Sequence, residues 1–215
     1  MHKAALFDLD GTLLDSLADI ADSMNIILAE MGFPGHPIDA YRYFVGEGVP
    51  PLIRRSLPPG RLDPELIERG GRMLKEEYSR RWHLQTRPYN GVSHLLNRLA
   101  EKGIPMSIFS NKPDEFARIM VAELLPDWTF RCVLGIKPGM PRKPDPTGAL
   151  EAARIMRVSP LEIAYLGDTK TDMLTAENAG MYAVGALWGF RTREELEKHG
   201  AKLLISDPSG FLDLF

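Results

Sequence analysis

From residue 91 onwards, short apolar runs alternate with amphipathic helical segments, and this alternation constrains the fold more than any other feature. The runs have the length of buried strands, and short links join them to helices at 91–102, 113–125, 146–156, 171–179 and 192–199. This order predicts an α/β, Rossmann-like three-layer core, in which right-handed crossovers place helices on both faces of a parallel sheet. The expected strands are 4–7, 105–109, 131–135, 163–166, 182–186 and, at an edge, 203–206.

Residues 16–87 differ in character from the sequence on either side. Apolar residues at helical spacing begin at Leu17, and Gly32 is the expected stop. The following segment is polar, proline-punctuated and without a convincing strand, and it includes a long amphipathic helix within 63–82. A chain of 215 residues is long for one small domain and short for two. We therefore predict a core formed by 1–15 and 88–215, with an inserted α-helical subdomain at 16–87.

Two aspartates stand where the first apolar run ends. Asp8 follows the run directly, Asp10 comes one residue later, and Gly11 supplies a turn. Ligands of open α/β sheets bind at the carboxyl ends of the strands. A buried strand has no structural need of two carboxylates, which repel each other unless a positive charge lies between them. Taken alone, the stretch also allows a solvated polar turn.

Polar residues follow three further strands of the predicted sheet. Ser110-Asn111-Lys112 come after 105–109, Lys143 lies among prolines after 131–135, and Asp168 and Asp172 follow 163–166. Parallel strands bring these segments to the edge that carries Asp8 and Asp10. Several carboxylates make a hard-oxygen site suited to Mg²⁺, while a hydroxyl and an ammonium can hold phosphate oxygens. The sequence therefore predicts a magnesium–phosphate site at this edge.

These four segments resemble the ordered motifs of the haloacid dehalogenase-like hydrolase superfamily, and the resemblance covers essentially the whole chain. The motifs are Asp8-Leu9-Asp10-Gly11-Thr12, Ser110-Asn111-Lys112, Lys143-Pro144-Asp145-Pro146 and Gly167-Asp168-Thr169-x-x-Asp172. Within the superfamily the chain looks most like the phosphoglycolate phosphatase group, in which 16–87 corresponds to a type 1 helical cap. Two less specific marks support this group: the glycine-containing segment 45–53 and Trp188-Gly189-Phe190.

The resemblance implies a role for each motif residue. Asp8 is the expected nucleophile, which forms an aspartyl-phosphate, and Asp10 is the expected general acid and base. The implied metal ligands are Asp8, the backbone carbonyl of Asp10, and Asp168, with Asp172 orienting metal-bound water or the lysine. The implied substrate-binding residues are Thr12, Ser110, Asn111 and Lys143.

Several of these residues have a structural alternative. Asp172, Ser110 and Asn111 are also suited to capping a helix. Lys143 could be an ordinary exposed loop lysine, although the neighbouring prolines favour the phosphate role. For Thr12, a bond to phosphate and a bond to a turn amide are evenly balanced.

The function expected from this resemblance is Mg²⁺-dependent hydrolysis of a small phosphomonoester, with 2-phosphoglycolate the leading candidate. A sugar phosphomutase is one alternative, although Thr12 slightly favours hydrolysis. Pyrophosphatase or nucleotidase activity is another, and a non-catalytic phosphate-binding module is a third. The last is disfavoured because an unused cluster of like charges costs stability. Asp10 argues against a dehalogenase or a phosphonate hydrolase, since both lack the second aspartate.

Composition excludes several partners. A net charge of −3 and a pI near 6.0 give no sign of nucleic-acid binding. No apolar run approaches the ~20 residues that span a bilayer, and the first strand begins too early to leave room for a signal peptide. The single cysteine, Cys132, lies in an apolar run and is expected to be a buried, inert thiol. These features predict a cytoplasmic protein and leave its oligomeric state open.

Overall fold

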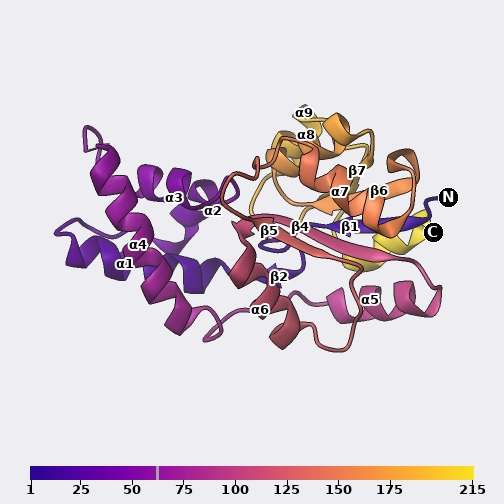
Figure 1. Cartoon of the computed structure of the whole chain (residues 1–215), viewed down its shortest axis with the longest axis horizontal. Coiled ribbons are helices and arrows are strands. Elements are labelled where there is room, and N and C mark those ends of the chain that lie inside the picture. Colours follow the sequence, from indigo (N-terminus) through magenta and orange to yellow (C-terminus); the bar gives the residue numbers. More distant parts are fainter. Residues whose placement is uncertain (62) are drawn as a thin grey trace. The chain divides into compact units, whose positions relative to one another are not determined.

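The structure is a computed structural model that describes residues 1–61 and 63–215. The chain divides into two compact units (Figure 1). One unit is discontinuous and consists of Met1–Asp15 and Pro88–Phe215, and the other is the insert, Ser16–Arg87. Among the described residues, no helix is both long enough and apolar enough to cross a membrane.

The discontinuous unit is built on a six-stranded parallel sheet with strand order β5-β4-β1-β6-β7-β8. The all-buried strand β1 (Ala4–Phe7) lies in the middle of the order and pairs with β4 on one side and β6 on the other. The remaining strands are β4 (Met106–Pro113), β5 (Val133–Ile136), β6 (Ile163–Gly167), β7 (Tyr182–Ala186) and β8 (Leu203–Ile205). The predicted parallel α/β sheet is confirmed, and β8 is an edge strand as expected.

Helices cover both faces of this sheet. Figure 1 shows α5 (Val92–Glu101) and α6 (Asp114–Leu124) on one side, and α7 (Thr147–Met156), α8 (Lys170–Ala179) and α9 (Arg193–Lys198) on the other. The short 3₁₀ helices η2 (Pro160–Glu162) and η3 (Pro208–Leu214) are not anticipated by the sequence analysis. Helix α8 begins with a capping box formed by Thr169 and Asp172, and it ends at Gly180 in the left-handed conformation.

Strand β4 is longer than predicted. The expected strand ends at Phe109, and the polar Ser110, Asn111 and Lys112 that follow are expected to form a loop. In the structure β4 continues through all three residues to Pro113, with a shift of register against β5 between Phe109 and Pro113. The three polar residues are buried. Three consecutive polar residues are typical of a loop, and this is why the sequence analysis ends the strand too early. Here they lie at the carboxyl end of a buried strand, beside the predicted site.

The insert is helical, as expected. Its elements are α1 (Leu17–Glu30), η1 (Ile38–Ala40), α2 (Tyr41–Phe44), α3 (Val49–Ser56) and α4 (Pro64–Arg81). Asp63 caps α4 by accepting a hydrogen bond from the Leu66 N–H. The two-residue strand β3 (Arg87–Pro88), which the sequence analysis does not anticipate, begins at the last residue of the insert and pairs with β2 (Leu14–Asp15).

A buried carboxylate connects the two ends of the insert. Asp19 in α1 accepts hydrogen bonds from the backbone N–H groups of Gln85 and Thr86 and from the Thr86 hydroxyl, with donor–acceptor distances of 2.7–3.1 Å. The side chain is almost fully buried. Because a buried carboxylate must find donors, these contacts hold the first helix of the insert to its last residues.

Cys132 immediately precedes β5 and is half-buried, less enclosed than the sequence analysis predicts. Its Sγ lies 3.4 Å from the Ser107 hydroxyl oxygen. Burial raises the pKa of the thiol, which disfavours the reactive thiolate. The predicted inert character therefore agrees with its surroundings.

Candidate active site

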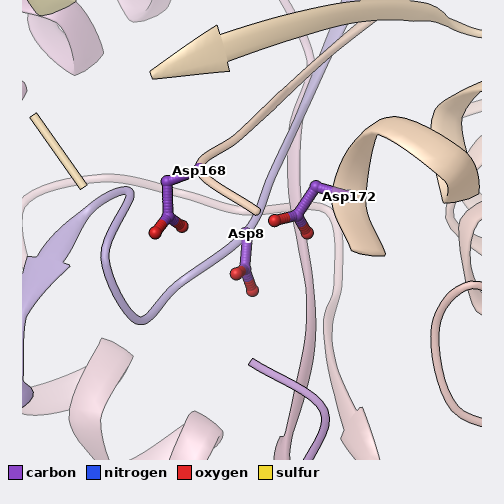
Figure 2. Close-up of side chains that lie close together, drawn as sticks. All are labelled: Asp8, Asp168 and Asp172. Atoms are coloured by element: carbon purple, nitrogen blue, oxygen red, sulfur yellow. The ribbon is translucent and has the colours of Figure 1, made fainter. Parts of the chain in front are cut away.

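Three buried carboxylates lie together at the carboxyl edge of the sheet (Figure 2). Asp8 directly follows β1, Asp168 follows β6, and Asp172 lies in the first turn of α8. One oxygen from each side chain can be chosen so that all three lie within 4.8 Å of one another. The sequence analysis places these three residues at one sheet edge, and the structure brings their side chains together.

Lys143 extends into this carboxylate cluster. Its Nζ lies 2.6 Å from Asp172 Oδ1 and 2.9 Å from Asp8 Oδ1, and it donates to the backbone carbonyl of Phe109 at 3.1 Å. The centroids of the Phe109 and Tyr165 rings lie 5.6 and 5.8 Å from the same nitrogen. Burial alone would lower the pKa of Lys143, but Asp172 and Asp8 raise it well above its usual value. Lys143 is therefore a buried cation, and the exposed-lysine alternative does not apply.

Asn111 holds the backbone that carries Lys143. Its Oδ1 accepts the Lys143 N–H at 2.8 Å, and its Nδ2 donates to the Lys143 carbonyl at 3.3 Å. Ser110 is buried beside it, and its Oγ accepts the N–H of Lys112 at 3.4 Å. Helix α6 starts after Pro113, so Asn111 is not its cap. Its contacts join β4 to the lysine loop, a connection that the expected substrate-binding role does not include.

Asp168 is held by two turns that are distant in sequence. Its Oδ1 accepts the Thr12 hydroxyl at 2.8 Å, and its Oδ2 accepts the Phe190 N–H at 2.8 Å. The Trp188 indole N–H donates to the Thr12 carbonyl at 3.0 Å. A Cβ added to Gly189 would lie only 2.2 Å from Asp168 Cβ. Only glycine therefore permits this close approach of the 188–190 segment.

The Thr12 hydroxyl has a partner that the sequence does not predict. This residue is fully buried, and its hydroxyl donates a hydrogen bond to Asp168. Trp188 and Phe190, which the sequence analysis names only as part of a mark of the group, both support this arrangement. Their aromatic-glycine pattern was the available signal, but it does not identify what the segment contacts.

Asp172 combines the two roles considered for it. One oxygen, Oδ2, accepts the N–H and the hydroxyl of Thr169 at 3.0 and 2.7 Å, which caps α8. The other oxygen, Oδ1, accepts from Lys143 at 2.6 Å and from the Tyr165 hydroxyl at 3.3 Å. Helix capping and orientation of the lysine are therefore compatible, because each uses a different oxygen.

The Asp10 side chain is paired with Lys112 and is not a member of the three-carboxylate cluster. Lys112 Nζ donates to Asp10 Oδ1 at 3.0 Å and to Oδ2 at 3.1 Å. Lys112 belongs to the Ser110-Asn111-Lys112 motif, but the sequence implies no function for it. A metal-ligand role for Asp10 would have to use its backbone carbonyl, as the resemblance implies.

The electrostatics of the cluster fit a divalent cation. The three carboxylates and the Lys143 ammonium leave a formal charge of −2. Burial, together with the charge of Asp172, raises the pKa of Asp8 to about 7 although Lys143 opposes the shift, and burial raises the pKa of Asp168 well above its usual value. Asp8 Oδ1 is buried near Lys143, yet no described residue donates a well-directed hydrogen bond to it. Hard oxygen donors with excess negative charge are typical of Mg²⁺ sites.

Comparisons with known proteins agree with this fold. The model of the haloacid dehalogenase-like hydrolase family matches residues 5–186. The chain therefore belongs to the haloacid dehalogenase-like hydrolases, and the resemblance stated from the motifs is confirmed.

Several of the individual proteins that the chain resembles are phosphoglycolate phosphatases. The chain is 31% identical over 211 residues to the phosphoglycolate phosphatase of Pseudomonas putida strain KT2440, covering 96% of this chain and 77% of that protein. It is 29% identical to the phosphoglycolate phosphatase of Psychrobacter arcticus, covering 97% and 93%. A crystal structure from Lactobacillus delbrueckii subsp. bulgaricus, provisionally described as a phosphoglycolate phosphatase, is similar with a TM-score of 0.92 at 29% identity, covering 98% and 97%.

Proposed function

We propose that this protein is a Mg²⁺-dependent phosphatase that hydrolyses a small phosphomonoester, with 2-phosphoglycolate as the first candidate substrate. The observation that carries the proposal is the position of Asp8, which lies beside the Lys143 ammonium and two further carboxylates at the end of a buried strand. The phosphoglycolate phosphatases among its relatives supply the candidate substrate. The Mg²⁺ would be held by the side chains of Asp8 and Asp168 and by the backbone carbonyl of Asp10.

The cation would neutralise the charge on the phosphoryl oxygens, which otherwise repel an attacking carboxylate. Asp8 attacks phosphorus, the bond from phosphorus to the ester oxygen breaks, and an aspartyl-phosphate forms. Asp10 gives its proton to the departing oxygen. Lys143 and Ser110 hold the non-bridging oxygens by charge and hydrogen bonding.

The second step regenerates the enzyme. Asp10, now ionised, takes a proton from a water molecule whose oxygen attacks phosphorus. The bond between phosphorus and the Asp8 oxygen breaks, which releases inorganic phosphate and restores the Asp8 carboxylate. In this scheme Asp172 and Asn111 keep Lys143 in place, while Thr12 and the 188–190 segment keep Asp168 in place.

The two units would divide the work. We assign 1–15 and 88–215 as the catalytic core and 16–87 as the cap that selects the substrate. The partner would be a small phosphorylated metabolite. We also propose a cytoplasmic location, because one unpaired cysteine suits a reducing compartment.

Phosphate release from a panel of substrates tests this proposal. The panel contains 2-phosphoglycolate, pyrophosphate, nucleotides and hexose phosphates, each with Mg²⁺ and with a chelator. We expect Mg²⁺-dependent release that is fastest with a small monoester. Conversion of a hexose 1-phosphate to its 6-phosphate would identify a mutase instead, and release that is unaffected by the chelator would contradict the cation requirement.

A further inference from the structure

The ion pair between Lys112 and Asp10 is a second lysine–carboxylate arrangement beside the one centred on Lys143. Lys112 Nζ contacts both oxygens of Asp10 nearly symmetrically, at 3.0 and 3.1 Å. The Lys112 side chain is 5% exposed and the Asp10 side chain 17%. Burying a lysine ammonium costs free energy because it loses its hydration, and the contact with the Asp10 carboxylate offsets this cost.

The backbones on both sides of this pair are fixed. Lys112 lies within β4 between Phe109 and Pro113, which both pair with β5, and the register shifts between these two pairs. Asp10 forms an isolated β-bridge with Leu14. With both backbones held, a cation shared between the two carboxylate oxygens restricts rotation of the Asp10 carboxylate about its Cβ–Cγ bond. The contact therefore sets the direction in which Asp10 presents its oxygens.

We propose that Lys112 is a positioning residue that orients Asp10 for proton transfer. The inference rests on the proposed function, in which Asp8 attacks phosphorus and Asp10 exchanges the protons. Lysines then divide between the two aspartates: Lys143 lies next to the nucleophile, and Lys112 lies next to the acid and base. Lys112 touches no reacting atom in this scheme and acts through Asp10.

If Lys112 orients Asp10, its loss should affect kcat/KM differently for alkyl and aryl phosphate esters. An alkyl ester releases a strongly basic alkoxide and needs the proton from Asp10 as the bond to phosphorus breaks. An aryl ester such as p-nitrophenyl phosphate releases a stable phenolate and does not need that proton. The ratio kcat/KM covers the steps up to departure of this group. Misorienting Asp10 must therefore slow alkyl esters more than aryl esters, whereas a general loss of charge or folding affects both equally.

The test compares kcat/KM for 2-phosphoglycolate and p-nitrophenyl phosphate in the wild type and in Lys112→Met. We expect the variant to lose at least about 10-fold more on the alkyl ester, within the range that a positioned general acid contributes. Lys137→Met is the matched control, because Lys137 lies 3.7 Å from Asp114 on the surface and is more than half exposed. The control should leave both values unchanged.

Two further variants keep the test decisive. If Lys112→Met does not fold, Lys112→Gln, which keeps a polar group of similar length, should show the same preferential loss. In an Asp10→Asn background, adding Lys112→Met should cause less than about a threefold further change, because residues acting through one another are not additive. Equal losses of kcat/KM on both esters, or a full further loss when Lys112→Met is added to Asp10→Asn, would overturn this inference but leave the proposed function standing. A wild type that hydrolyses no phosphate ester would overturn the proposed function and this inference with it.

Discussion

At the scale of residues, the site is an assembly of groups that would be unfavourable singly. Asp8, Asp168 and Asp172 are buried, one carboxylate oxygen from each lies within 4.8 Å of the other two, and Lys143 offsets part of their charge. Leaving a net negative charge in a buried cluster costs stability unless a cation binds. The raised pKa values of Asp8 and Asp168 have the same cause: burial and the neighbouring carboxylates destabilise the ionised form, so both carboxyls are easier to protonate in the folded protein.

Mg²⁺ is therefore expected to stabilise the protein in a pH-dependent way. The pKa of Asp8 is about 7 in the fold and near 4 when unfolded, so without metal the free energy of unfolding falls as pH rises between these values. Mg²⁺ binds only the ionised carboxylates, and its stabilising effect should grow over the same range. We expect saturating Mg²⁺ to raise Tm clearly more at about pH 8 than at about pH 5.5.

Asp8→Asn is the variant that checks this origin. The neutral amide removes one charge from the cluster, so the metal-free variant should be at least as stable as the wild type at pH 8. It should also lose most of the Tm increase with Mg²⁺ and nearly all activity. An Asp8→Asn protein that keeps the full pH-dependent Mg²⁺ effect would show that the cation is bound elsewhere.

The residues of the site are easier to predict from the sequence than the partners of their side chains. Asp8, Asp168 and Asp172 could be found because carboxylates at the ends of buried strands have no structural explanation. The contacts Thr12–Asp168 and Lys112–Asp10 join residues 156 and 102 positions apart, and no local pattern specifies such pairs. The sequence thus predicts which residues meet at the sheet edge, while packing alone decides which oxygen meets which donor.

At the scale of elements, periodicity predicted most helices and strands, and the errors have a common cause. The end of β4 was misjudged because Ser110, Asn111 and Lys112 are polar and buried at once. The strands β2 and β3 have two residues each and are too short to give a periodic signal, and the 3₁₀ helix η3 does not follow the 3.6-residue period of an α-helix. Where polar side chains serve the site, or where an element lacks the period of an α-helix or a strand, the pattern gives no reliable boundary.

Two adjacent glycines in α4 give a prediction at this scale. A Cβ added to Gly71 would meet only Val49 Cγ1 at 3.8 Å, whereas one added to Gly70 would lie 2.9 Å from Ile53 Cγ2. Gly71→Ala should therefore stabilise the protein by about 0.5–1 kcal/mol, the usual gain in a helix. Gly70→Ala should gain less or destabilise, since Ile53 must move. Chemical denaturation measures both, and an equal gain at the two positions would contradict the packing described for α3 and α4.

At the scale of the whole molecule, a helical insert interrupts the sequence of the unit that forms the parallel sheet, shortly after its first strand. The chain must leave and return without disturbing Asp8 and Asp10, which lie just before the insert. Within the insert, Asp19 ties the first helix to Gln85 and Thr86. This carboxylate therefore keeps the beginning and the end of a segment of about seventy residues together.

Replacing Asp19 should be costly. Asp19→Asn puts an amide N–H₂ against backbone and hydroxyl donors, and we expect a loss of about 2–4 kcal/mol in the free energy of unfolding. Asp22→Asn is the matched control, because Asp22 accepts a single exposed hydrogen bond from Gln85 and should change stability by less than about 0.5 kcal/mol. Similar small losses for both variants would show that the buried contact does not hold the insert together.

The central claim is that Asp8 is the nucleophile of a Mg²⁺-dependent phosphatase, and trapping the covalent intermediate tests it most directly. The protein is mixed with Mg²⁺ and 2-phosphoglycolate, quenched rapidly in acid and digested, and the peptides are examined by mass spectrometry. We predict one added phosphoryl group on the peptide that contains Asp8, and no such group in Asp8→Asn or without Mg²⁺. With p-nitrophenyl phosphate, whose leaving group needs no proton from Asp10, the phosphorylated peptide should be enriched in Asp10→Asn because hydrolysis of the intermediate is slowed. Turnover with a phosphoryl group on another residue, or undiminished turnover in Asp8→Asn, would contradict the account.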